Sequence, residues 1–190
     1  MLSIVKSMTL HGLEGFIVDV QVDVAGGLPC WEIVGLPDVS IREAKERVRT
    51  AIKNSGYEFP SRRIVINLAP ATIKKVGSAF DLPIAIAILL ATENVNEFDF
   101  ENVAFVGELS LDGNVHSITG ILPMCIEAKK LGIKEIVVPK ENAKEASIVD
   151  GINVIPVSSL NQVVAYLNKS IKINPEKFKS NELIKSKQVY

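Results

Sequence analysis

Lysine and arginine side chains are concentrated in one part of this chain of 190 residues. Residues 40–76 hold nine Lys or Arg and three Glu, whereas residues 81–112 hold seven Asp or Glu and neither Lys nor Arg. The formal net charge of −1 hides this separation. A segregated charge distribution bears on binding partners rather than on fold. It permits three interpretations: two solvated faces of opposite sign, a nucleic-acid-binding surface, or contacts between neighbouring subunits of a ring.

The helical spacing of apolar residues predicts an amphipathic helix from Ser40 to about Gly56. Ser40 and Glu43 have the spacing of a capping box at its start. The apolar stripe consists of Ile41, Ala44, Val48, Ala51 and Ile52. Four cations fall outside this stripe, namely Arg42, Lys45, Arg49 and Lys53. We expect these four side chains to face solvent or a partner.

Two further pairs of cations stand at the ends of predicted elements. Arg62-Arg63 precede a short, nearly all-apolar strand, and Lys74-Lys75 precede the loop before the next helix. Long cationic side chains at such ends can project together, and Arg binds phosphate through two parallel hydrogen bonds. Alternatively, Arg63 or Lys75 caps carbonyl groups or pairs with Glu58. For the cluster as a whole we favour phosphate binding.

The usual signatures of a catalytic or metal site are absent from the sequence. Its two histidines, His11 and His116, have no carboxylate or Cys at metal-ligand spacing. The sequence has no Walker A motif, no GxGxxG after a strand and no GxSxG elbow. Cys30 and Cys125 are far apart and form no CxxC pair, so we expect reduced thiols and a cytoplasmic protein. We predict no catalytic residue, metal or cofactor in this chain.

The remaining patterns predict an α/β fold with a mixed sheet packed against helices, because a hairpin and strand–helix–strand units are both present. The apolar run 82–91 predicts a buried helix capped by Asp81, and it is too short to span a membrane. The Asp112-Gly113 pair indicates a hairpin. The predicted strands or extended segments are 1–10, 14–24, 31–34, 63–68, 103–109, a segment around 115, 135–138 and 153–157. Further predicted helices are 121–131 and one from Ser158 or Ser159 to about Leu167. The lysine-rich residues 168–190 indicate a linker or tail.

Several long motifs occur in order: VGLPD, RVRTAIKNSG, FPSRRIVINLAPA, a KK-x-G-x-x-FDLPIA block and GELSLDGNVHSITGILP. Over residues 1–167 the chain therefore resembles the N-terminal domain of the Mg-chelatase-like AAA+ ATPases, the YifB/ComM family. The resemblance implies that this domain precedes an AAA+ module that binds ATP and Mg²⁺, with residues 168–190 as the start of the linker. It also implies a hexameric motor for DNA branch migration in natural transformation and homologous recombination.

The N-terminal domain of that family is similar to the proteolytic domain of Lon and to the C-terminal domain of the DNA-repair ATPase RadA. The resemblance to Lon places Ala79 at the position of the nucleophilic serine, within residues 77–81. It places Leu122 at the position of the catalytic lysine, within residues 119–122. A nucleophile and its base must lie within about 3 Å of each other, so these two residues imply a non-catalytic domain. Ser78 is one residue out of register.

We therefore expect a non-catalytic, ring-organising domain that contacts the phosphates of single-stranded, duplex or branched DNA without reading sequence. The acidic segment 81–112 is expected to face away from DNA, toward a neighbouring subunit of a homo-oligomer. One alternative is a purely oligomerising or protein-binding scaffold, and another is a Lon-like serine peptidase with a shifted dyad. The candidate DNA-binding residues are Arg42, Lys45, Arg49, Arg62, Arg63, Lys74 and Lys75.

Overall fold

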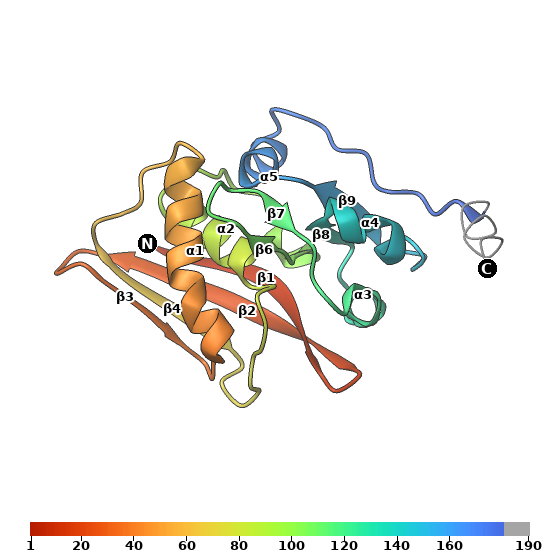
Figure 1. Ribbon diagram of the computed structural model, residues 1–190, viewed down its shortest axis with the longest axis horizontal. Coiled ribbons are helices and arrows are strands. Elements are labelled where there is room, and N and C mark those ends of the chain that lie inside the picture. Colours follow the sequence, from red (N-terminus) through yellow and green to blue (C-terminus); the bar gives the residue numbers. More distant parts are fainter. Residues whose placement is uncertain (181–190) are drawn as a thin grey trace.

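The computed structural model describes residues 1–180, and its main feature is a seven-stranded mixed sheet (Figure 1). The strand order is β3-β4-β2-β1-β5-β8-β9. Strand β2 is antiparallel to β1 and β4, and the other neighbouring strands are parallel. The strands are β1 (Leu2–His11), β2 (Glu14–Ala25), β3 (Cys30–Val34), β4 (Arg63–Ala69), β5 (Val103–Phe105), β8 (Glu135–Pro139) and β9 (Asn153–Val157).

The predicted hairpin around Asp112-Gly113 is confirmed, but it lies apart from the main sheet. Strands β6 (Glu108–Leu109) and β7 (Val115–His116) form a separate two-stranded sheet. The predicted strand 103–109 is interrupted because Gly107 leaves the sheet and bonds to the start of the buried helix. Its N–H donates to the Ala79 carbonyl, and its own carbonyl accepts from the Leu82 N–H, each at 3.0 Å. This break brings Glu108 to the start of that helix, where its carboxylate accepts from the Ser78 hydroxyl.

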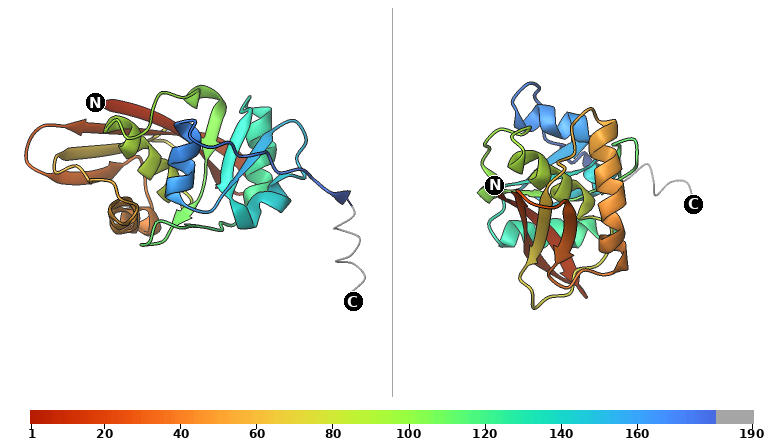
Figure 2. Two further views of the ribbon diagram at one scale, coloured as in Figure 1. Left: turned by 90° about the horizontal axis from the view of Figure 1, so that it is seen from above. Right: turned by 90° about the vertical axis from the view of Figure 1, so that its left-hand side faces the viewer.

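Helices cover both faces of the sheet (Figure 2). Strand residues on one face, such as Phe105 and Val137, share a core with α1, α2 and α5. Their neighbours on the opposite face, Ala104 and Ile136, pack against α3 and α4. This alternation follows from the period of two along a strand. The helices are α1 (Val39–Asn54), α2 (Asp81–Ala91), α3 (Ile121–Lys130), α4 (Lys140–Ala146) and α5 (Leu160–Leu167), with a 3₁₀ turn at Phe100–Asn102.

Helix α2 is the centre of the larger core. Every residue from Asp81 to Leu89 is buried, as the unbroken apolar run predicts. The helix lies on β1 and β2, and α1 packs against it from the outside. Helix α1 therefore has one face buried against α2 and one face open to solvent.

After α5 the chain runs as a loop through residue 179, and the Glu176 N–H donates to the Val154 carbonyl of β9 at 2.8 Å. The last ten residues of the predicted tail, 181–190, lie outside the described residues. None of the described helices is long and apolar enough to cross a membrane.

Candidate functional site

Helix α1 begins at a different cap from the predicted one. Its N-cap is Asp38, whose Oδ1 accepts from the Ile41 N–H at 2.9 Å, while Oδ2 accepts from the Gly77 N–H at 3.0 Å. Ser40 lies inside the first turn, so the prediction of a Ser40–Glu43 capping box was wrong. A carboxylate has two oxygens and can accept from two segments at once, which a Ser hydroxyl does less well. Asp38 thus joins the start of α1 to the loop before α2.

Four cations lie along the solvent side of α1, as the spacing predicts. At 3.6 residues per turn, Arg42, Lys45, Arg49 and Lys53 fall within one narrow stripe about 16 Å long. Glu46 lies on the same side. In the part of the chain that the structure describes, none of these four cations forms a salt bridge. Lys53 was missing from the predicted site residues, although its position four residues after Arg49 puts it on the stripe.

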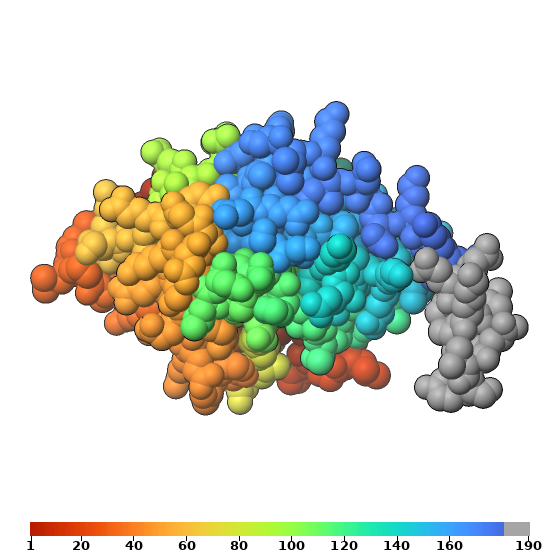
Figure 3. All heavy atoms as spheres, turned by 45° about the horizontal axis from the view of Figure 1, so that its top comes forward, coloured from red at the N-terminus to blue at the C-terminus, as the bar shows by residue number. Residues whose placement is uncertain are grey.

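Arg62 joins this stripe, and Arg63 does not. Arg62 lines a cavity of 380 Å³ together with Arg49 and Lys53. Arg63 is the first residue of β4 and is followed by the buried Ile64, which packs in the core beneath α1. Successive side chains of a strand point to opposite faces, so Arg63 projects from the other side of the sheet. We define the basic face as Arg42, Lys45, Arg49, Lys53 and Arg62; Figure 3 shows α1 (orange) as an uncovered strip of surface.

The structure corrects the prediction that Lys74 and Lys75 project together. Lys74 is exposed, but Lys75 is fully buried, and its Nζ donates to the Gly35 carbonyl at 2.8 Å and to the Pro70 carbonyl. Burial lowers the pKa of the Lys75 ammonium. Lys75 therefore caps carbonyl groups, which was the alternative interpretation, and its side chain cannot reach a phosphate.

The shortest ion pair among the described residues links α1 to α2. Arg47 Nε and Nη2 donate to the two carboxylate oxygens of Asp81 at 2.7 and 3.0 Å, and the Asp81 side chain has no exposed surface. The Leu109 N–H donates to the same carboxylate at 3.1 Å. Burial raises the pKa of Asp81 to about 6, although Arg47 and the Leu109 N–H act to lower it. The prediction that the Asp81 side chain caps α2 was wrong. Its carboxylate instead accepts from Arg47, 34 residues earlier in the sequence, and this ion pair fixes α1 on α2.

The acidic segment does not face away from the basic face as a unit. Asp81 is buried against Arg47, and Ser78 Oγ donates to the Glu108 carboxylate. Glu93 shares a surface hollow with Arg62. The acidic residues of segment 81–112 are therefore distributed over the core and several surfaces. The prediction that this segment faces away from the basic face was wrong.

The residues that correspond to the Lon nucleophile motif, 77–79, line a cavity of 270 Å³. Its lining includes Ser78, Ala79, Glu108 and Thr119. The Ser78 hydroxyl is hydrogen bonded to Glu108, and the methyl group of Ala79 offers no nucleophile. Leu122 lies in the first turn of α3.

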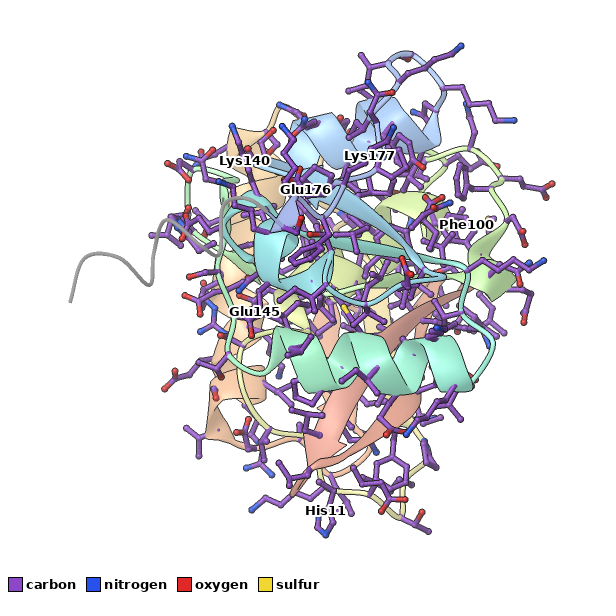
Figure 4. The ribbon with its side chains drawn as sticks, turned by 90° about the vertical axis from the view of Figure 1, so that its right-hand side faces the viewer. His11, Phe100, Lys140, Glu145, Glu176 and Lys177 are labelled. Atoms are coloured by element: carbon purple, nitrogen blue, oxygen red, sulfur yellow. The ribbon has the colours of Figure 1, made fainter. Side chains whose placement is uncertain are left out.

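Neither histidine belongs to a metal site among residues 1–180. His11 is exposed at the end of β1 (Figure 4), and His116 is exposed in β7. The described residues contain no group of three or more His, Cys, Asp or Glu that could hold a metal ion.

Comparison with known proteins places this fold in a family. A family model described as subunit ChlI of Mg-chelatase matches residues 20–142. Competence protein ComM of Haemophilus influenzae is 38% identical over 172 residues, covering 90% of this chain and 34% of ComM. YifB of Escherichia coli, an uncharacterized protein, is 40% identical over 166 residues, covering 87% of this chain and 33% of YifB. Lon protease 2 of Bacillus subtilis is 28% identical over 191 residues, covering 90% of this chain and 33% of that protease.

The mixed sheet and the similarity to Lon define an α/β domain of Lon-like character, which confirms the predicted fold class. The chain belongs to the Mg-chelatase-like family that includes YifB and ComM. It spans about a third of the length of these relatives.

Proposed function

We propose that this domain contacts the phosphate backbone of DNA through its basic face and that it works within a Mg-chelatase-like AAA+ ATPase. The observation that carries the proposal is the set of five cations on one surface, none of which is in a salt bridge among the described residues. Unpaired Lys and Arg are free to replace the counterions that surround DNA, which supplies sequence-independent affinity. The name of ComM, a competence protein, fits a role in handling DNA.

The rest of the proposal follows the family resemblance. The larger protein is a hexameric ring that moves DNA branches, and its AAA+ module holds ATP and Mg²⁺. This chain has no Walker A motif, so nucleotide binding is assigned to that module. The role of the present domain is to hold DNA and to orient the ring, with no covalent chemistry of its own.

The DNA proposal is tested by fluorescence anisotropy with labelled duplex and four-way-junction DNA. The double variant Arg42→Glu/Arg49→Glu reverses two charges of the basic face. The matched control, Lys134→Glu/Lys140→Glu, reverses two exposed charges near β8, and Lys140 is labelled in Figure 4. We expect the first variant to lose at least about tenfold in affinity and the control to stay within about twofold of wild type. Equal loss in both variants, or no loss in either, would contradict the proposal.

A second candidate function is a scaffold that binds a neighbouring subunit. The observation that favours it is a group of exposed apolar side chains, Leu36, Val39 and Val76, at two joined loops. The Lys75 N–H donates to the Leu36 carbonyl, and the Asp38 N–H donates to the Lys75 carbonyl, each at 3.0 Å. Analytical ultracentrifugation of Val39→Glu, compared with wild type, tests this candidate. A concentration-dependent oligomer that the variant abolishes would support it.

The peptidase alternative depends on Ser78, because its hydroxyl donates to a carboxylate that could act as a base. A fluorophosphonate probe tests this directly. Labelling that disappears in Ser78→Ala would support a peptidase, and absence of labelling would remove this alternative.

A further inference from the structure

The cavity of 380 Å³ at the end of the basic face combines aromatic rings with cations. Its walls come from three separate segments: Trp31 on β3, Arg49 and Lys53 on α1, and Phe59 with Arg62 in the connection to β4. The volume is within the range of small-ligand pockets, about 300–1,000 Å³. No carboxylate lines it among the residues that the structure describes.

The two aromatic rings are held in fixed positions. Trp31 and Phe59 meet edge to face, with their ring centroids 5.2 Å apart and their planes at 89°. The Arg49 guanidinium carbon lies 5.1 Å from the centre of the Phe59 ring. Such a cation–π contact orients the guanidinium and leaves its N–H groups for other partners. Phe59 is buried in the core, so core packing holds the Phe59 ring in place.

From these observations we propose that the cavity receives an unpaired nucleobase of single-stranded DNA. The base packs against the Trp31–Phe59 pair, and Arg49, Lys53 and Arg62 hold the flanking phosphates. Aromatic platforms beside a cationic groove are the general means by which proteins bind single strands without sequence preference. A base within a duplex is paired and stacked on both sides, so it cannot enter. The inference rests on the proposed function and adds a preference for single-stranded over duplex DNA.

The chain provides its own probe, because Trp31 is its only tryptophan. Single-stranded oligothymidylate is titrated into the protein while tryptophan fluorescence is recorded, in parallel with an abasic strand of equal length. We expect the thymidylate strand to quench Trp31 and the abasic strand to leave its fluorescence unchanged. The abasic strand should also bind about 5- to 150-fold more weakly for each stacked base.

Two matched variants localise the effect. Arg49→Gln and Lys134→Gln each remove one exposed charge, but only Arg49 lines the cavity, and Lys134 lies outside the basic face. We expect Arg49→Gln to reduce the quenching amplitude at saturation and Lys134→Gln to leave that amplitude unchanged. Phe59→Leu keeps an apolar side chain in the core while it removes the ring, and it should abolish the difference between the two strands.

The outcomes separate the two proposals. If both strands bind equally and neither quenches Trp31, the base pocket is overturned and phosphate contact through the basic face still holds. If neither strand binds even at low salt, both proposals are overturned.

Discussion

Removing Arg47 is expected to destabilise the domain strongly, because it leaves Asp81 buried without its counter-charge. Arg47 makes two hydrogen bonds to the Asp81 carboxylate and a third, at 2.8 Å, to the Ser40 carbonyl. Breaking a buried ion pair by removing one partner costs about 3–5 kcal/mol. We therefore expect Arg47→Met to lower the free energy of unfolding by about 3–4 kcal/mol at neutral pH, as measured by urea denaturation.

The pH dependence of this loss follows from the pKa of Asp81. Burial raises that pKa from 3.8 to about 6 in the wild-type fold. The folded state therefore binds the proton more tightly than the unfolded state, and the free energy of unfolding falls as pH rises from about 4 to about 6. Without Arg47 the folded-state pKa rises further, and the fall continues to higher pH. Lowering the pH from about 7 to about 5 should therefore recover about 1 kcal/mol more in Arg47→Met than in wild type.

Two variants control for other effects of the substitution. Arg42→Met removes an exposed cation from the same helix and should change stability by less than about 0.5 kcal/mol. Adding Asp81→Asn to Arg47→Met removes the buried charge but keeps an acceptor for the Leu109 N–H, so it should restore part of the loss. The reasoning is refuted if Arg47→Met costs less than about 1 kcal/mol, or if its stability follows pH no more steeply than that of Arg42→Met.

Four further substitutions test the segments around the start of α1, each by urea denaturation. Lys75→Met removes a buried donor to two carbonyl groups and should lower the free energy of unfolding by about 1–3 kcal/mol. Because Lys75 is not on the surface, the same substitution should leave the salt dependence of DNA binding unchanged. Gly35→Ala should lower the free energy of unfolding by more than about 1 kcal/mol, because Gly35 has φ of +102° and an added Cβ would lie 2.3 Å from the Leu68 carbonyl oxygen. An unchanged free energy of unfolding would refute this backbone geometry at Gly35. Asp38→Ala should cost about 1–2 kcal/mol and Ser40→Ala less than about 0.5 kcal/mol, and the reverse order would restore the predicted capping box.

The sequence predicts the elements of this fold better than their contacts. The buried helix α2, the alternating strand β2 and the Asp112-Gly113 hairpin are encoded by local patterns, and the structure has all three. Helix α4 was not predicted, because its seven residues, KENAKEA, show no apolar stripe. It is stabilised by its packing against strands β8 and β9.

The candidate site shows the same limit. The stripe on α1 follows from helical spacing, so Arg42, Lys45 and Arg49 could be predicted to lie together. The burial of Lys75 depends on the Gly35 carbonyl, 40 residues earlier, which no local pattern reveals. In the same way, the contact between Trp31 and Phe59 exists only once β3 has paired with β4.

The salt dependence of DNA binding tests the central claim most directly. The basic face has five cations, and each phosphate contact on duplex DNA contributes about −0.9 to the slope of log K against log salt concentration. Fluorescence anisotropy of wild-type protein with duplex DNA over a salt series should therefore give a slope of about −4 to −5, and Arg42→Glu/Arg49→Glu should flatten it to about −2 to −3. A slope near zero, or one that this variant leaves unchanged, would contradict the assignment of DNA binding to the basic face.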